Sequence, residues 1–521
     1  MVVLSLLVRR WCRVGLISFS LAACSTSEPA LVQSAALQDL LPSSYFAQTP
    51  VAPQLLLNRW TWGSNAASEA ALKELGADSY LAAQLRPRTM ALPSAVQAQI
   101  NAMTITQKPF VKMMEELDQQ REAAAKMKGV DDSLRKAYQQ ELSRLAREAG
   151  SRAILRAVYS PNQLLEQMDW FWMNHFNLSS RKENLRAMLG DFEESAIRPH
   201  ALGRFRDLLR ATLLHPAMLR YLDNEHNAAN NINENYAREL MELHTMGVNS
   251  SYTQLDVQEL ARVLTGLGVR IGAEPGRLAL QPGYARMGLT EFNPRRHDFG
   301  DKTLLGQTIR GRGIAELDQV LMILTRHPNT ARFVSRKLAQ YFVSDTPSDA
   351  LVNAMAQRFL QTDGDIPAVL KHMFETQEFV ASLGQKFKDP VHYVISALRL
   401  NDAELPIVNA GPVLNWLNQL GQLPNGHQTP DGYAMHASAW NSAAQMTARF
   451  DVAKLIARGA PGLFCVNDTE MTTARINLAK NPYAKNWSQT FTASSRDALT
   501  QSANAQEWSA LFLSAPEMMT R

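Results

Sequence analysis

The sequence is poor in cysteine, and this excludes a fold held together by disulfides. Only three cysteines occur in 521 residues. Cys12 lies in an N-terminal segment that we expect to be removed, and Cys24 lies at the end of that segment. Cys465 is then left without an intramolecular partner. The chain must rely on a packed core, and it is long enough to form one large domain or several packed units.

Beyond residue 23 the chain has no long apolar run and no block of basic residues. A transmembrane helix needs about 20 apolar residues, and no second segment is apolar enough to span. Removing residues 1–23 takes away Arg9, Arg10 and Arg13 and no acid, so the formal net charge falls from +4 to +1. The composition therefore gives no electrostatic basis for a nucleic-acid partner, and we expect none.

Several motifs of known chemistry are also missing. The sequence contains no Gly-x-Ser-x-Gly, no Walker motif, no dinucleotide fingerprint and no His-Glu-x-x-His, and Cys465 has no histidine near it in the sequence. A function cannot be assigned from a local motif of these kinds.

The N-terminus has the features of a bacterial lipoprotein signal. Three arginines precede the apolar run 14–21, which is too short to span a bilayer. Leu21-Ala22-Ala23-Cys24 resembles a lipobox, whose cysteine receives a diacylglycerol and a further acyl chain, and two or more chains anchor stably. The alternative is an ordinary secretory peptide with an accidental cysteine. We predict a signal peptide at 1–23, lipidation of Cys24 and a flexible tether over 24–50.

These features predict a cell-envelope protein attached to the membrane through its lipid anchor. Ser25, rather than an aspartate, follows the cysteine, which resembles sorting to the outer membrane. The sequence does not indicate which face of that membrane the protein occupies.

From residue 51 onward the apolar spacing is helical almost throughout, and strand signals are scarce. The charged segment 111–149 predicts a helical hairpin interrupted at 129–133. Two segments, 270–312 and 401–440, are irregular and rich in glycine and proline. The fold class expected is all-α: a single large multi-helical domain over 51–521 with two long irregular loops.

Short junctions between helices recur along the chain. His215-Pro216 and His327-Pro328 each follow one apolar helix and precede another, and proline is favoured at the first helical position. We therefore interpret both histidines as junction residues rather than ligands. Thr253 and Asp256 have the spacing of a capping box before an amphipathic helix.

The segment 230–248 carries the most chemical information. Its asparagines and Gly247 predict the start and end of a helix of three to four turns. At about 100° per residue, Asn235, Arg238, Glu239 and Glu242 form one polar stripe on a helix that is otherwise apolar. The stripe is either a solvated face with i,i+4 ion pairs or the wall of an internal site.

Two further segments add candidate residues. The apolar run 170–176 contains His175, whose ring either bonds a carbonyl or serves as a ligand. The irregular segment 293–302 contains His297 and Asp298. One divalent metal is a candidate cofactor, with His175, Glu239, Glu242 and His297 as its ligands. The candidate catalytic residues are Asn235, Arg238, Glu239, Glu242, His297 and Asp298.

Over about residues 55–521 the chain resembles the bacterial family catalogued as domain of unknown function 1800. The matching stretches are 56–63, 171–176, 233–247, 252–266, 297–302, 428–433 and Trp440. The resemblance implies no established activity. It does imply an exported partner of the family numbered 1501, which is similar to alkaline phosphatases and sulfatases and is often encoded beside members of this family.

The function expected is therefore that of an envelope lipoprotein of unknown molecular activity. The first hypothesis is a binding and assembly protein that acts with such an exported partner. The alternative is a metal-assisted hydrolase that uses Glu239, Glu242, His175 and His297. The sequence leaves open whether the protein is an enzyme at all.

Overall fold

The computed structural model describes residues 44–521 except 249, 274–275, 402–405, 460–461 and 465–475. Cys24, the signal segment 1–23 and Cys465 lie outside the described residues, as does most of the predicted tether. Helix α2 (Tyr45–Gln48) falls inside the tether range, yet its Phe46 is buried and packs edge-on against Trp60. The folded body thus begins before residue 51, which corrects the predicted boundary.

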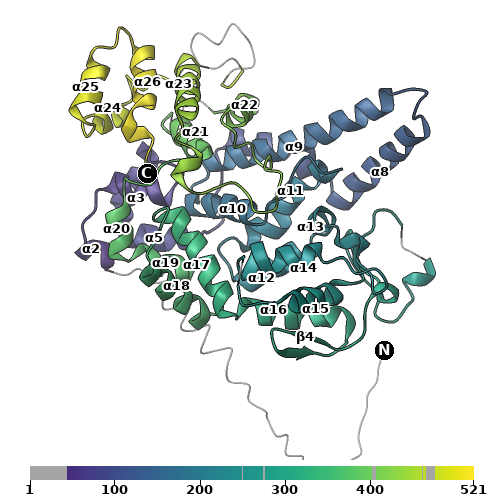
Figure 1. Cartoon of the computed structure of the whole chain (residues 1–521). Helices are drawn as coiled ribbons and strands as arrows, with labels where there is room; N and C mark the ends of the chain where they lie inside the picture. Colours follow the sequence, from purple (N-terminus) through teal and green to yellow (C-terminus); the bar gives the residue numbers. More distant parts are fainter. Residues whose placement is uncertain (1–43, 249, 274–275, 402–405, 460–461, 465–475) are drawn as a thin grey trace, which may run out of the picture.

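Helices make up most of the described chain, which confirms the all-α fold class (Figure 1). The first half contains α3 (Pro53–Trp60), α4 (Ala66–Leu75), α5 (Ala77–Leu85), α6 (Ser94–Ala102), α7 (Thr104–Gln107), α8 (Phe110–Lys126), α9 (Ser133–Tyr159), α10 (Gln163–His175), α11 (Leu189–Asp191), α12 (Phe205–Leu214), α13 (Pro216–Tyr221), α14 (Asn235–Glu239) and α15 (Gln254–Leu264). The second half contains α16 (Glu316–Thr325), α17 (Pro328–Phe342), α18 (Asp349–Gln361), α19 (Ile366–Phe374), α20 (Gln377–Ser382), α21 (Pro390–Arg399), α22 (Gly411–Gln419), α23 (Ala443–Arg458), α24 (Pro482–Ser488), α25 (Ala493–Thr500) and α26 (Ala505–Ser514). Within the described ranges, no helix combines the length and apolar character that crossing a membrane requires.

Helices α8 and α9 form the predicted hairpin, which projects from the body in Figure 1. The turn between them contains Gly129 at a positive φ of 83°, a conformation that glycine adopts readily. Asp131 accepts a hydrogen bond from the Ser133 backbone N–H at 2.8 Å and so helps to start α9. The C-terminal half of α9 buries its apolar face in the body.

The two segments expected to be irregular are partly regular. Residues 267–309 contain a three-stranded antiparallel sheet in the order β1 (Leu267–Val269), β3 (Thr290–Phe292), β2 (Ala285–Met287), and a hairpin of β4 (Lys302–Leu304) and β5 (Gln307–Ile309). Segment 401–440 includes helix α22. Each strand is three residues long, which is too short for an alternating apolar pattern to show in the sequence.

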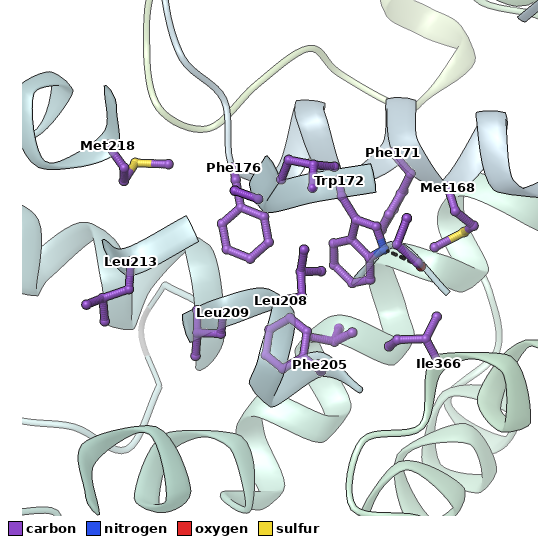
Figure 2. Close-up of a cluster of buried hydrophobic side chains, with 14 of the residues drawn as sticks. Met168, Phe171, Trp172, Phe176, Phe205, Leu208, Leu209, Leu213, Met218 and Ile366 are labelled. Carbon is purple, nitrogen blue, oxygen red and sulfur yellow. Dashed lines mark hydrogen bonds between the residues drawn. The ribbon is translucent and has the colours of Figure 1, made fainter. Parts of the chain in front are cut away.

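The apolar run on α10 lies in the core, as its composition predicts. Figure 2 shows its aromatic side chains packed against those of α12, and the Trp172 indole N–H donates a hydrogen bond to the Ala201 carbonyl at 3.0 Å. Trp170, on the same helix, packs against both clusters of buried apolar side chains. Helix α10 therefore provides a rigid support for Asn174 and His175 at its end.

The predicted junctions are confirmed. His215 and His327 are the N-caps of α13 and α17, and each Nδ1 accepts a hydrogen bond at 3.1 Å from the backbone N–H two residues later. Thr253 and Asp256 form the capping box of α15. All three signals rely on contacts within one turn, which a sequence pattern reports directly.

Candidate functional site

The predicted polar stripe lies on a helix that changes pitch halfway along. Helix α14 passes directly into the π-helical segment η5 (Leu240–Thr245). The Met246 N–H accordingly bonds the carbonyl of Met241, five residues earlier, at 2.8 Å. Gly247 ends the segment at a positive φ of 89°, as predicted. π-Helical turns occur frequently at functional sites, so this segment is a candidate on structural grounds as well.

The stripe itself is partly exposed, and part of it forms i,i+4 ion pairs. Arg238 contacts Glu234 at 3.0 Å and Glu242 at 3.6 Å. Asn235 is exposed, and its side-chain amide donates to the Leu222 carbonyl at 3.1 Å. Of the two alternatives, the stripe is therefore closer to the solvated face than to the wall of an internal site, although the other sides of the same helix are buried.

Glu239 is the exception on this stripe. Within the described part of the chain the Glu239 carboxylate makes no hydrogen bond or ion pair, although the side chain is only partly exposed. Burial raises the pKa of Glu239, and the neighbouring charges of Glu242 and Asp431 raise it further, while Arg238 opposes them. A carboxylate in this position is under-neutralised and available to an incoming cation or donor.

A pair of buried histidines lies behind the stripe. The Nε2 atom of His175 is 3.0 Å from the carbonyl oxygen of His244, and the two rings are 6.1 Å apart. Burial lowers the pKa of both rings, that of His244 to about 3, so both are neutral at pH 7. Nδ1 of His175 and Nε2 of His244 have no partner among the described residues. The alternative in which His175 bonds a carbonyl is the one observed.

Lys337 on α17 lies within electrostatic range of this pair. It is partly buried, and its ammonium group lies 5.6 Å from the centre of the Phe333 ring. No ion pair or hydrogen bond of Lys337 is present in the described ranges, and burial lowers its pKa to about 8, against the opposing effect of Asp431. Gly247 permits this packing, because a Cβ there would lie 2.9 Å from the Phe333 ring.

Asp431 belongs to the loop 427–433, which α10 holds in place. The Asn174 side chain accepts from the Tyr433 N–H at 2.7 Å and donates to the Tyr433 carbonyl at 3.0 Å. Asp431 is in turn 3.1 Å from His427. Gly432 makes the closest approach, since a Cβ there would lie 2.2 Å from the Asn174 carbonyl. We call Glu239, Glu242, His175, His244, Lys337 and Asp431 the motif cluster.

His297 and Asp298 do not join the motif cluster. Both ring nitrogens of His297 are engaged, Nε2 with Glu316 at 2.9 Å and Nδ1 with the Thr265 carbonyl at 2.8 Å. Lys302 binds the other oxygen of Glu316 at 2.7 Å, and the side chains of this triad are fully buried. Asp298 is paired with Arg262 at 2.8 Å. We call His297, Lys302 and Glu316 the buried triad; its role is to hold the segment 297–316 together.

The four predicted metal ligands are accordingly not gathered at one point. In the ranges that the structure covers, no group of three or more His, Cys, Asp or Glu side chains is arranged to hold a metal ion. His175 and His244 each offer one free nitrogen, but the ligand set that includes His297 does not fit one centre.

Three residues of the motif cluster are not candidates from sequence: His244, Lys337 and Asp431. His244 lies in the motif 233–247 but outside the polar stripe. Lys337 lies on an amphipathic helix, where a lysine gives no signal of its own. Asp431 lies in the 428–433 motif, which carried the family resemblance but no assigned chemistry. All three become notable only through their neighbours in the folded chain.

Glu239 and Lys337 are partly buried charged groups without an ion-pair partner among the described residues, so the site is suited to binding a group of opposite charge. The fold and the site thus define an all-α protein in which three motifs and helix α17, distant in sequence, build one polar site over a buried histidine pair.

Residues 55–520 match the family described as "Protein of unknown function (DUF1800)", and the chain belongs to it. The resemblance noted from the motifs is thereby confirmed. No curated protein and no solved structure matches the chain.

Proposed function

We propose that this protein is a lipid-anchored protein of the bacterial envelope, sorted to the outer membrane, that binds and helps to assemble an exported partner protein. The lipobox-like sequence ending at Cys24 supports the anchor and the location. The partner class comes from the family resemblance, which associates it with exported proteins similar to alkaline phosphatases and sulfatases.

The observation that carries the binding role is the pair of unpaired charges in the motif cluster. Glu239 and Lys337 are held on packed helices without ion-pair partners among the described residues, and burial disfavours the charged form of each. Such groups reduce the stability of the free protein. Complementary charges on a docked partner would offset that loss, which is how interfaces gain specificity.

The anchor is tested by the substitution Cys24→Ser. Lipidation forms a thioether, for which the serine hydroxyl is no substitute, so a labelled fatty-acid analogue should mark the wild type only. The variant should leave the membrane fraction with its melting temperature unchanged. Equal labelling of both proteins would contradict the anchor, and Cys12→Ser serves as the matched control.

The binding role is tested by Glu239→Gln and Lys337→Met, which remove charge while keeping much of the shape. Neither should destabilise the free protein, and Lys337→Met should stabilise it by about 1–3 kcal/mol at pH 7.5, since the folded state disfavours its charge. The pKa of Lys337 is about 8 when folded. Wild-type stability therefore rises with pH above that value, and the advantage of Lys337→Met in thermal melts should shrink by about pH 9.5.

Binding is then measured with the purified exported partner of the 1501 family from the same organism. We expect each variant to weaken the complex at least about tenfold, the equivalent of losing one interfacial charge pair. The exposed residues Glu122 and Lys73 provide matched controls as Glu122→Gln and Lys73→Met. Unchanged affinity in both test variants, or a marked loss of stability in either, would contradict the proposal.

A further inference from the structure

A narrow cavity lies between α9, α10 and α21, beside the loop that carries Asp431. The volume open to water-sized molecules is about 50 Å³. Small residues of α9 leave the space, and two tryptophans contribute to the walls. The lining residues that matter here are Ala149, Gly150, Ala153, Ala157, Trp62 and Trp170. A volume this small with mostly apolar walls suits an unbranched chain better than a bulky ring system.

Three carboxyl groups contribute to the wall of the cavity, and two of them are paired with arginines. Glu166, Asp169 and Glu193 line the cavity, and Glu193 lies on the π-helical segment η2 (Phe192–Ile197). Three arginines neutralise Glu166, Glu193 and the adjacent Glu194. Glu166 contacts Arg198, Glu193 contacts Arg152 at 3.2 Å, and Glu194 contacts Arg156 at 2.8 Å. Four carboxyl groups thus face three guanidinium groups.

Asp169 is the carboxyl group left over. Its side chain is buried with only 6% of the residue exposed, and Oδ1 has no hydrogen-bond partner among the described residues. Burial raises the pKa of Asp169 well above its usual value, Glu193 and Glu166 add to the rise, and Arg198 and Arg156 oppose it. These surroundings favour the neutral acid of Asp169, and no fourth arginine in the described group offsets its negative charge.

We propose that this cavity binds an unbranched organic amine, with its apolar chain along α9 and the two tryptophans and its ammonium group paired with Asp169. This site is independent of the partner-binding role proposed above. The protonated amine enters from water, Asp169 gives up its proton to solvent, and the ammonium group donates hydrogen bonds to the resulting carboxylate. The burial of a charged pair is acceptable here because both charges are matched.

The test compares three probes of equal length, hexylamine, 1-hexanol and hexanoate, on the detergent-solubilised full chain. Titration calorimetry and tryptophan fluorescence report binding, the latter because Trp62 and Trp170 line the cavity. We expect hexylamine to bind at least about tenfold tighter than either of the other probes. Calorimetry in buffers of different ionisation enthalpy should show about one proton released per amine bound at neutral pH.

Two variants separate the site from general folding effects. Asp169→Asn imitates the neutral acid, so it should fold and lose the preference for the amine. Ala153→Leu should fill the cavity and abolish binding of all three probes, while Glu194→Gln, at an exposed carboxylate of the same group, is the control. Equal binding of the three probes, no binding of hexylamine, or an amine preference that survives in Asp169→Asn would each overturn the proposal.

Discussion

Lys302→Met is expected to destabilise the protein by about 3–5 kcal/mol, because it removes one cation from a fully buried carboxylate. Lys302 contacts Glu316 at 2.7 Å, and neither side chain is exposed to solvent. The lysine also donates to the Asp298 carbonyl. The variant would leave Glu316 with the His297 ring and two backbone N–H groups, those of Arg312 and Gly313.

Chemical denaturation of the two proteins measures this loss. Lys73→Met is the matched control, because Lys73 is exposed and its ion pair with Glu69 lies at the surface, where such pairs contribute about 0–1 kcal/mol. His297→Gln should also be destabilised, because an amide can replace only one of the ring's two hydrogen bonds. The loss should be smaller than in Lys302→Met, because Glu316 keeps its lysine. A loss in Lys302→Met no greater than in the control would show that the buried triad does not hold segment 297–316.

The same triad predicts the pH dependence of stability. Burial alone would raise the pKa of Glu316. Hydrogen bonds from His297 and Lys302 outweigh this effect and hold that pKa below its usual value. The unfolded state therefore takes up the proton first as pH falls. The contribution of Glu316 is present above about pH 4.5 and is lost at lower pH. In Lys302→Met this loss on the acid side should be smaller than in the wild type.

Arg59→Met is expected to reduce stability by about 4 kcal/mol or more, because several buried acceptors would lose their donor at once. Arg59 is fully buried and donates to the carbonyls of Ser382 at 2.8 Å and Arg521 at 2.6 Å. It also contacts the Phe342 carbonyl and the Ser382 hydroxyl. Its guanidinium group therefore joins α3 to α17, α20 and Arg521.

Arg59→Lys tests the geometry of this link. Lysine keeps the charge but lacks the planar fork of donors, so we expect a loss that remains well above that of the control. The control is Arg135→Met, whose ion pair with Asp132 is exposed on both sides. Thermal melts that show Arg59→Lys as stable as the wild type would mean that charge alone, and not the set of hydrogen bonds, stabilises this region.

The motif that contains Arg59 shows which features the sequence predicts and which it does not. The stretch 56–63 belongs to the family pattern, but the pattern does not reveal that the Arg59 side chain is buried and makes its hydrogen bonds in the core. His297 and Asp298 were candidates for catalysis because they lie in an irregular segment with other charges. The structure assigns both to ion pairs with side chains 19 and 36 residues away.

The sequence by itself determined the features of this protein that depend on contacts between neighbouring residues. The helical spacing fixed the all-α class and the α8–α9 hairpin, and the caps at His215, His327 and Thr253 follow from hydrogen bonds to groups two or three residues away. The family resemblance also came from the sequence, through several motifs in order. Each of these signals is contained in one short segment, so no knowledge of the packing was needed.

Tertiary structure alone decided which polar groups meet. The three-residue strands are stabilised by pairing across the sheet, and the π-helical turn at 240–245 breaks the fixed angle per residue on which the stripe was drawn. Lys337 approaches the histidine pair, and Asp431 approaches Lys337 and Glu239, only because α10 and α17 pack together with the 427–433 loop. Burial and neighbouring charge set the state of a titratable group, and both are properties of the folded chain rather than of any segment of it.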